Sequence, residues 1–125
     1  MASEEKDKSS MSALAIEEKA RDWVIQLQDK ERKRSGRKKP EVRRVVAKEI
    51  GVVPGTLENI ERRRRNGIST TVFERIRAAF LREAANELKW WENERQIALQ
   101  IGLDARCDEV REVEANIKAL QEVMK

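Results

Sequence analysis

Residues 42–65 read VRRVVAKEIGVVPGTLENIERRRR, and they decide how the rest of the chain is interpreted. Apolar side chains recur in the first half of this stretch at helical spacing, which marks one face of a helix. They are Val42, Val45, Val46 and Ile50. Gly51 then supplies the positive φ of a tight turn, and Pro54 suits the first position of a new helix, where its missing N–H costs nothing. The stretch predicts two short helices joined at Gly51, the second ending in a run of arginines.

This pattern resembles the helix-turn-helix family of bacterial and phage DNA-binding regulators. The resemblance covers roughly a fifth of the chain and rests on a small residue, a glycine four residues later and apolar positions around them. These positions are Val46, Ala47, Ile50, Gly51, Val52, Leu57 and Ile60. It implies that residues 54–65 form a recognition helix that lies in the major groove of DNA. The alternative is an ordinary α-hairpin without a nucleic acid partner, which the arginine cluster disfavours.

Polar side chains that point away from the apolar stripe of the second helix are the candidates to contact base edges. They are Thr56, Asn59, Arg62 and Arg63. Asparagine pairs with adenine and arginine with guanine through two hydrogen bonds, and threonine contacts a thymine methyl group. Other cations near the motif are expected to contact phosphates, which position a protein without reading sequence. They are Arg43, Arg44, Arg64 and Arg65.

A basic segment, KERKRSGRKK, precedes the motif at residues 30–39. Its last three cations, Arg37, Lys38 and Lys39, are expected to form an arm that lies along phosphates or enters a minor groove. A solvated linker is the alternative. From Asp29 to Arg65 the chain has 14 Lys/Arg against 6 Asp/Glu, a net charge of +8, whereas the remaining residues carry −4. Positive charge concentrated around one motif is the pattern of a module that binds a polyanion.

The composition excludes several classes of fold and function. With 39% hydrophobic and 40% charged residues, long helices with narrow apolar stripes are expected rather than one large core, and the fold class is all-α. The chain has no histidine and a single cysteine, Cys107, so zinc sites and histidine-based catalysis are not expected. We expect no enzyme activity, cofactor or metal. A single cysteine, a polar N-terminus and the lack of an 18-residue apolar run favour a cytoplasmic, nucleoid-associated protein without a membrane span.

The regions on either side of the motif suggest how the domains are organised. Residues 1–11 are expected to be a disordered tail. Residues 12–82 are expected to form the DNA-binding domain. The first helix of this domain is expected to start near Ala13 and to pack on the rest of the domain through Trp23. A long helix then follows a Ser69 cap. Residues 83–125 are expected to form a helical hairpin or coiled coil for dimerisation. The side chains expected at that interface are Leu88, Trp91, Val110, Val113, Ile117, Leu120 and Met124.

The last helix can fold back on residues 80–101, pair with its copy in a second subunit, or do both, and both are expected. The resulting function is sequence-specific binding of double-stranded DNA by a homodimer that regulates transcription, most simply as a repressor. A protein partner at the C-terminal helices is an alternative means of control. Two other functions remain open. The first is a DNA-binding protein that forms a higher oligomer, either for phage DNA packaging, as a terminase small subunit does, or in an architectural role. The second is a scaffold that binds an acidic protein or RNA.

Overall fold

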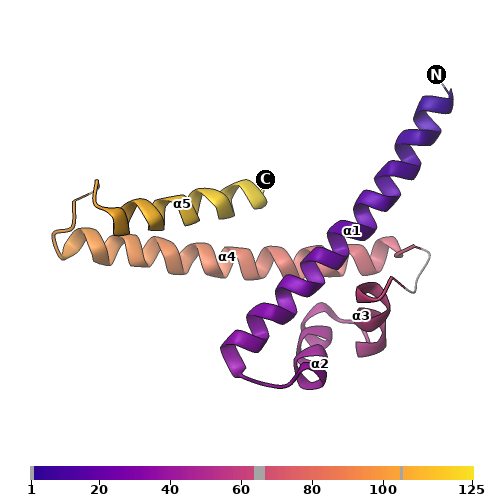
Figure 1. Ribbon diagram of the computed structural model, residues 1–125, viewed down its shortest axis with the longest axis horizontal. Helices are drawn as coiled ribbons and strands as arrows, with labels where there is room; N and C mark the ends of the chain where they lie inside the picture. Colours follow the sequence, from indigo (N-terminus) through magenta and orange to yellow (C-terminus); the bar gives the residue numbers. More distant parts are fainter. Residues whose placement is uncertain (1, 64–66, 105) are drawn as a thin grey trace. The chain divides into compact units, whose positions relative to one another are not determined.

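Figure 1 shows the computed structural model of the protein, which describes residues 2–63, 67–104 and 106–125, with side chains from Leu14 onward. Over these residues there are five α-helices and no strand, which confirms the all-α prediction. The helices are α1 (Ala2–Ser35), α2 (Lys39–Ile50), α3 (Pro54–Glu61), α4 (Thr70–Gln100) and α5 (Asp108–Val123). None of the described helices is both long and apolar enough to cross a membrane.

The chain divides into two compact units, Met1–Phe80 and Leu81–Lys125. The first unit contains α1, α2, α3 and the beginning of α4, and the second contains the rest of α4 and α5. The sequence predicted a boundary between residues 82 and 83, two residues further along the chain.

The turn between α2 and α3 has the geometry that the sequence predicted. Gly51 has a φ of 90°, and its N–H donates to the carbonyl oxygen of Ala47 at 2.8 Å. The N–H of Val52 donates to the same oxygen at 3.0 Å, so both bonds satisfy the end of α2. α3 begins at Pro54, as predicted. The all-α first unit therefore contains two helices joined by a short turn in the predicted place.

The core of the first unit lies where three helices and the start of α4 meet. Its buried side chains come from α1 (Ala20, Val24, Leu27), α2 (Val42, Val46, Ala47, Ile50), α3 (Leu57, Ile60) and α4 (Ile76, Ala79, Phe80). Trp23 packs at the edge of this core, with its ring centroid 5.2 Å from that of Phe80 and 5.6 Å from that of Phe73. Each fully buried aliphatic side chain contributes about 1.5–3 kcal/mol. Two helices as short as α2 and α3 therefore depend on α1 and α4 for stability.

The first helix begins earlier than the sequence predicted. α1 begins at Ala2 rather than near Ala13, so helix replaces the predicted disordered tail over residues 2–11. Extending an existing helix is far easier than nucleating one, and residues 2–11 contain neither glycine nor proline. α1 also continues through the basic segment to Ser35. Only residues 36–38 separate α1 from α2, so the predicted basic arm is a short connection held at both ends.

The third helix is shorter than the predicted 54–65. It ends at Glu61, and Arg62 is its C-terminal cap residue. Arg63 adopts a left-handed conformation with a φ of 56°, and its N–H donates to the carbonyl oxygen of Ile60 at 3.2 Å. Glycine usually occupies such a position, so no residue type marks this helix end in advance. Residues 64–66, which include the last two residues of the predicted helix, lie outside the described residues.

The second unit is a helical hairpin. Figure 1 shows α5 running back along the C-terminal half of α4, in the opposite direction. Gly102, with a φ of 91°, follows the end of α4, as predicted. Val110 and Ile117 of α5 are only 0% and 5% exposed. Their burial agrees with the prediction that the last helix folds back on the long one.

Candidate functional site

The first turn of α3 is exposed, whereas the opposite side of the helix is buried. Val53, which precedes the helix, is 67% exposed, and Pro54 and Gly55 are also exposed. Thr56 is half-buried, and its N–H donates to the carbonyl oxygen of Val53 at 3.0 Å. Leu57, in contrast, is completely buried. α3 is therefore held by one side and presents its N-terminal turn to solvent.

Arg62 and Arg63 are exposed, but both follow α3 rather than belong to it. Nη1 of Arg62 lies 3.0 Å from Oε1 of Glu58, and Nη2 of Arg63 lies 3.1 Å from Oε2 of Glu18. Glu58 and Arg62 are four residues apart, the spacing at which opposite charges on a helix can pair. Ion pairs this exposed contribute only about 0.2–1 kcal/mol, so an incoming phosphate can displace the carboxylate at little cost.

The four predicted base-reading residues do not line one groove. Asn59 and Arg63 line a small groove of about 200 Å³ beside α1, together with the carboxylates of Glu17 and Glu18. Arg62 lines a different groove, and Thr56 lines neither. The two glutamates of α1 repel a phosphate at the edge occupied by Asn59. The first helix, for which the sequence predicted only a packing role, therefore determines the surroundings of Asn59.

The predicted phosphate contacts also fall into separate groups. Arg37, Lys38, Lys39 and Arg44 are exposed. Arg43, in contrast, turns inward: its side chain is 15% exposed, with Nη2 at 3.2 Å from Glu61 Oε2 and Nη1 at 3.7 Å from Glu58 Oε2. These pairs hold both terminal nitrogens of the guanidinium group, so Arg43 is a weaker candidate for contact with a phosphate than the exposed cations. Arg64 and Arg65 lie outside the described residues.

Glu61 joins the three helices of the first unit. Its side chain is 14% exposed and accepts a hydrogen bond from Gln28 Nε2 of α1 at 2.5 Å, in addition to the bond from Arg43 of α2. Its backbone oxygen accepts a bond from Arg21 Nε at 2.9 Å, and Lys39 Nζ lies 4.0 Å from its carboxylate. We call these five residues the Glu61 cluster. The cluster ties the C-terminal end of α3 to α1 and α2.

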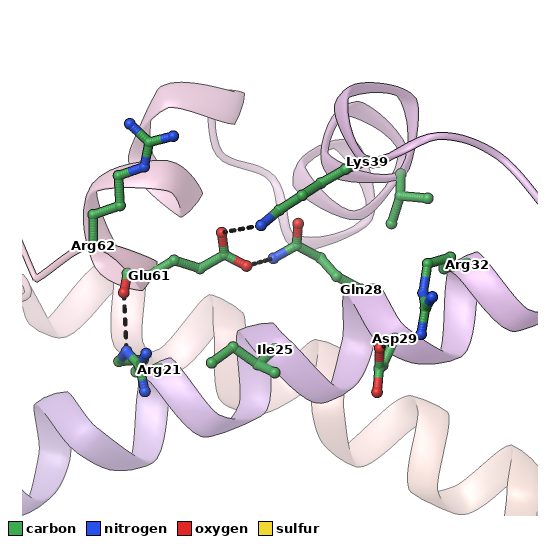
Figure 2. Close-up of a pocket in the computed structure, with 9 residues that line it drawn as sticks. Arg21, Ile25, Gln28, Asp29, Arg32, Lys39, Glu61 and Arg62 are labelled. Atoms are coloured by element: carbon green, nitrogen blue, oxygen red, sulfur yellow. Dashed lines mark hydrogen bonds and ion pairs between the residues drawn. The ribbon is translucent and has the colours of Figure 1, made fainter.

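A groove of about 610 Å³ opens beside the Glu61 cluster (Figure 2). Figure 2 shows the Gln28 amide and the end of Lys39 converging on the Glu61 carboxylate, with Arg62 on the α3 side and Arg32 on the α1 side. The groove is lined by Arg21, Ile25, Gln28, Asp29, Arg32, Lys39, Val42, Glu61 and Arg62. Four of these residues are cationic and two are anionic, so the lining has a net charge of +2.

Four residues that shape this site were not predicted from the sequence: Glu61, Gln28, Arg21 and Arg75. Glu61 had a usable signal, because it follows the buried Leu57 by four residues and therefore shares its side of α3. Arg75 Nη1 donates to the carbonyl oxygen of Gly51 at 2.7 Å and so supports the turn between α2 and α3. No local pattern could reveal that bond, because the two residues are separated by all of α3 and the start of α4.

The predicted dimerisation residues differ in accessibility. Val110 and Ile117 are buried within the hairpin of one chain, so their side chains are not exposed to a second copy. Leu88, Trp91, Val113 and Leu120 are half-buried, and Met124 is 37% exposed. The most exposed apolar side chains of α4 and the residue after it are instead Ile101 (72%) and Trp90 (54%).

No protein-family model matches this chain, and no curated protein or solved structure matches it significantly. A function for the protein therefore has to be argued from the geometry and chemistry of the described residues.

Proposed function

We propose that the protein binds double-stranded DNA through α2 and α3, which act as a helix-turn-helix, and that it regulates transcription as a homodimer. The observation that carries this proposal is the exposure of the first turn of α3 on a helix whose other side is buried. In helix-turn-helix proteins, residues at the N-terminal end of the recognition helix contact the base edges. The buried Leu57 and Ile60 would hold this helix rigidly while its first turn enters the major groove.

The shorter α3 changes which residues are proposed to read the bases. Thr56, together with the exposed Val53 just before the helix, is the best-placed candidate, since both offer methyl groups to a thymine and Thr56 adds a hydroxyl. Arg62 remains a candidate at the far end of α3. Asn59 and Arg63 are weaker candidates because Glu17 and Glu18 line the same small groove.

Contacts to the DNA backbone are proposed for the exposed cations around these helices. Arg37 and Lys38 lie in the connection before α2, and Arg44 lies on the exposed side of α2. A connection of three residues is too short to act as an arm in the minor groove. It is long enough to hold two cations against phosphates, which would position the protein without reading sequence.

Replacing Thr56 with alanine should lower the affinity for a preferred duplex about fivefold, because alanine offers neither the hydroxyl nor the γ-methyl group to a base. Affinity for random DNA should not change. Thr71→Ala is the matched control, since Thr71 is an exposed threonine of α4. Fluorescence anisotropy with labelled duplexes measures both affinities. Equal weakening for preferred and random DNA would show that Thr56 does not read a base.

Replacing both Arg37 and Lys38 with alanine should weaken binding to every duplex. It should also reduce the magnitude of the slope of log K against log[salt] by about 1.8, because each phosphate that is no longer neutralised accounts for about 0.9. The matched control is the double replacement Arg111→Ala and Lys118→Ala, which removes one arginine and one lysine from exposed positions of α5. An unchanged slope in the first variant would make the connection a plain linker.

A homodimer is proposed because one recognition helix contacts only a few base pairs, whereas two related by a two-fold axis read an inverted repeat. Exposed apolar side chains on the second unit support association with a second copy. Trp90, Ile97 and Ile101 are spaced by seven and four residues along the chain and are 54%, 44% and 72% exposed. Measuring the mass in solution tests this: two subunits fit a regulator, whereas eight or more fit a packaging protein.

A further inference from the structure

Gly55, the second residue of α3, is a glycine that the described fold does not require. The other glycines of the chain all have positive φ angles, between 70° and 117°, which residues with a Cβ resist. They are Gly36, Gly51, Gly67 and Gly102. Gly55 instead lies in the α-helix that begins at Pro54. A methyl group added to it would meet no heavy atom within 4 Å among the described residues, apart from its immediate neighbours in α3.

Glycine at this position also weakens α3. Glycine loses more backbone freedom than any other residue when a helix forms, so alanine is the more stable choice in a helix. α3 has only eight residues, and its buried side chains are Leu57 and Ile60. A residue that destabilises so short a helix, and that the described fold does not need, indicates a contact with a partner.

The surface around Gly55 is open and carries no negative charge in its own turn. Gly55 is exposed, and the neighbouring Val53 is 67% exposed. The first turn of α3 contains no acidic residue. The exposed Arg75 donates from Nη1 to the carbonyl oxygen of Gly51 at 2.7 Å, which places a cation beside the turn that leads into α3. DNA can therefore approach Gly55 without meeting the carboxylates that lie beside Asn59.

The missing side chain has a use if a partner must come close to the backbone of α3. Glycine is the usual residue where a backbone lies directly against a ligand. We infer that Gly55 is the point at which α3 comes closest to the base edges in the major groove, an inference that rests on the proposed function. The missing side chain lets Val53 and Thr56, which precede and follow this point, reach the bases. A methyl group at Gly55 would hold α3 away from the bases and weaken both contacts.

Gly55→Ala should change stability and DNA binding in opposite directions. In the full chain without DNA, amide hydrogen exchange of peptides from residues 54–61 should slow by about twofold to fivefold, because alanine favours the helix. Affinity for a preferred duplex should fall by about tenfold or more, because the added methyl group overfills the contact. Affinity for random DNA should change by less than about twofold, and the slope of log K against log[salt] should stay the same, because base edges carry no phosphate charge. Fluorescence anisotropy measures these affinities.

A larger side chain tests whether the effect is steric. Gly55→Leu should weaken binding to the preferred duplex more than Gly55→Ala does, by about a hundredfold, while α3 stays folded because leucine is also a good helix former. Ala78→Leu is the matched control, since Ala78 is an exposed residue of α4 in the first unit. The control should change the affinity by less than about twofold. Equal weakening by the two leucine variants would contradict a close approach at Gly55.

Three results for Gly55→Ala would overturn the inference. Unchanged affinity for the preferred duplex would show that α3 does not lie against the bases at this point. Equal loss of affinity for preferred and random DNA would place Gly55 against the phosphate backbone instead. Faster hydrogen exchange would show that the fold itself needs the glycine.

The wild-type chain separates the failure of this inference from the failure of the proposed function. A wild type that prefers no duplex would refute the proposed function and this inference together. A wild type with a clear preference, combined with an unaffected Gly55→Ala, would refute this inference alone.

Discussion

Replacing Leu57 with alanine is expected to lower the free energy of unfolding of the first unit by about 3 kcal/mol. Leu57 is 0% exposed and is the side chain of α3 that lies deepest in the core shared with α1 and α2. Alanine would leave a cavity that the short α3 cannot close, because Pro54 and Arg63 end the helix on either side. The proposed recognition helix would then be released from its support.

Hydrogen exchange of peptides from residues 42–61 in the full chain measures the change in unfolding free energy caused by Leu57→Ala. It reports on the first unit alone, which is needed because a chain with two units need not unfold in one step. Val53→Ala is the control, since Val53 is 67% exposed and its replacement should change the free energy by less than about 0.5 kcal/mol. If these peptides were as well protected in Leu57→Ala as in Val53→Ala, α3 would not be packed on α2 as described.

Replacing Ile117 with aspartate should detach α5 from α4. Ile117 is 5% exposed, and a carboxylate in its place would lose about 1.5–3 kcal/mol of apolar burial and add the cost of burying a charge. A hairpin of two helices has little stability to spare against this change. Circular dichroism should show reduced helicity, and limited proteolysis should cleave within residues 108–123.

Ile101→Asp introduces the same charge at a side chain that is 72% exposed and serves as the control. It should leave the hairpin folded. In the proposed dimer it should instead reduce the mass in solution from two subunits to one if the exposed side of α4 forms the interface. Full helicity and protease resistance in Ile117→Asp would contradict the packing of α5 on α4.

Local chemistry predicted much of the fold. The apolar spacing from Val42 to Ile50 and the glycine at position 51 predicted where α2 ends, because only local backbone geometry is involved. Ser69 was correctly predicted to cap the long helix, and its Oγ accepts a bond from the N–H of Val72 at 3.2 Å. The hairpin was predictable because steps of three and four along α5 require a partner helix.

The candidate site was far less predictable, because tertiary contacts determine it. From the sequence alone, Arg43 cannot be distinguished from the other cations near the motif. In the structure its side chain turns inward because it pairs with Glu61, eighteen residues away. Gln28 and Glu61 are separated by 33 residues, and no periodic pattern links them. The end of α3 was missed for a related reason, since a left-handed arginine has no sequence signal. Long-range polar contacts of this kind become visible only when the helices are packed.

The central claim is that α2 and α3 present the first turn of α3 to the base edges of duplex DNA. Selection of bound fragments from a random duplex pool, followed by competition between the selected and scrambled duplexes at physiological salt, tests it most directly. The full chain is expected to select an inverted repeat and to bind it at least about 10³-fold more tightly than the scrambled duplex. A preference of no more than about tenfold, with no consensus in the selected pool, would contradict the claim.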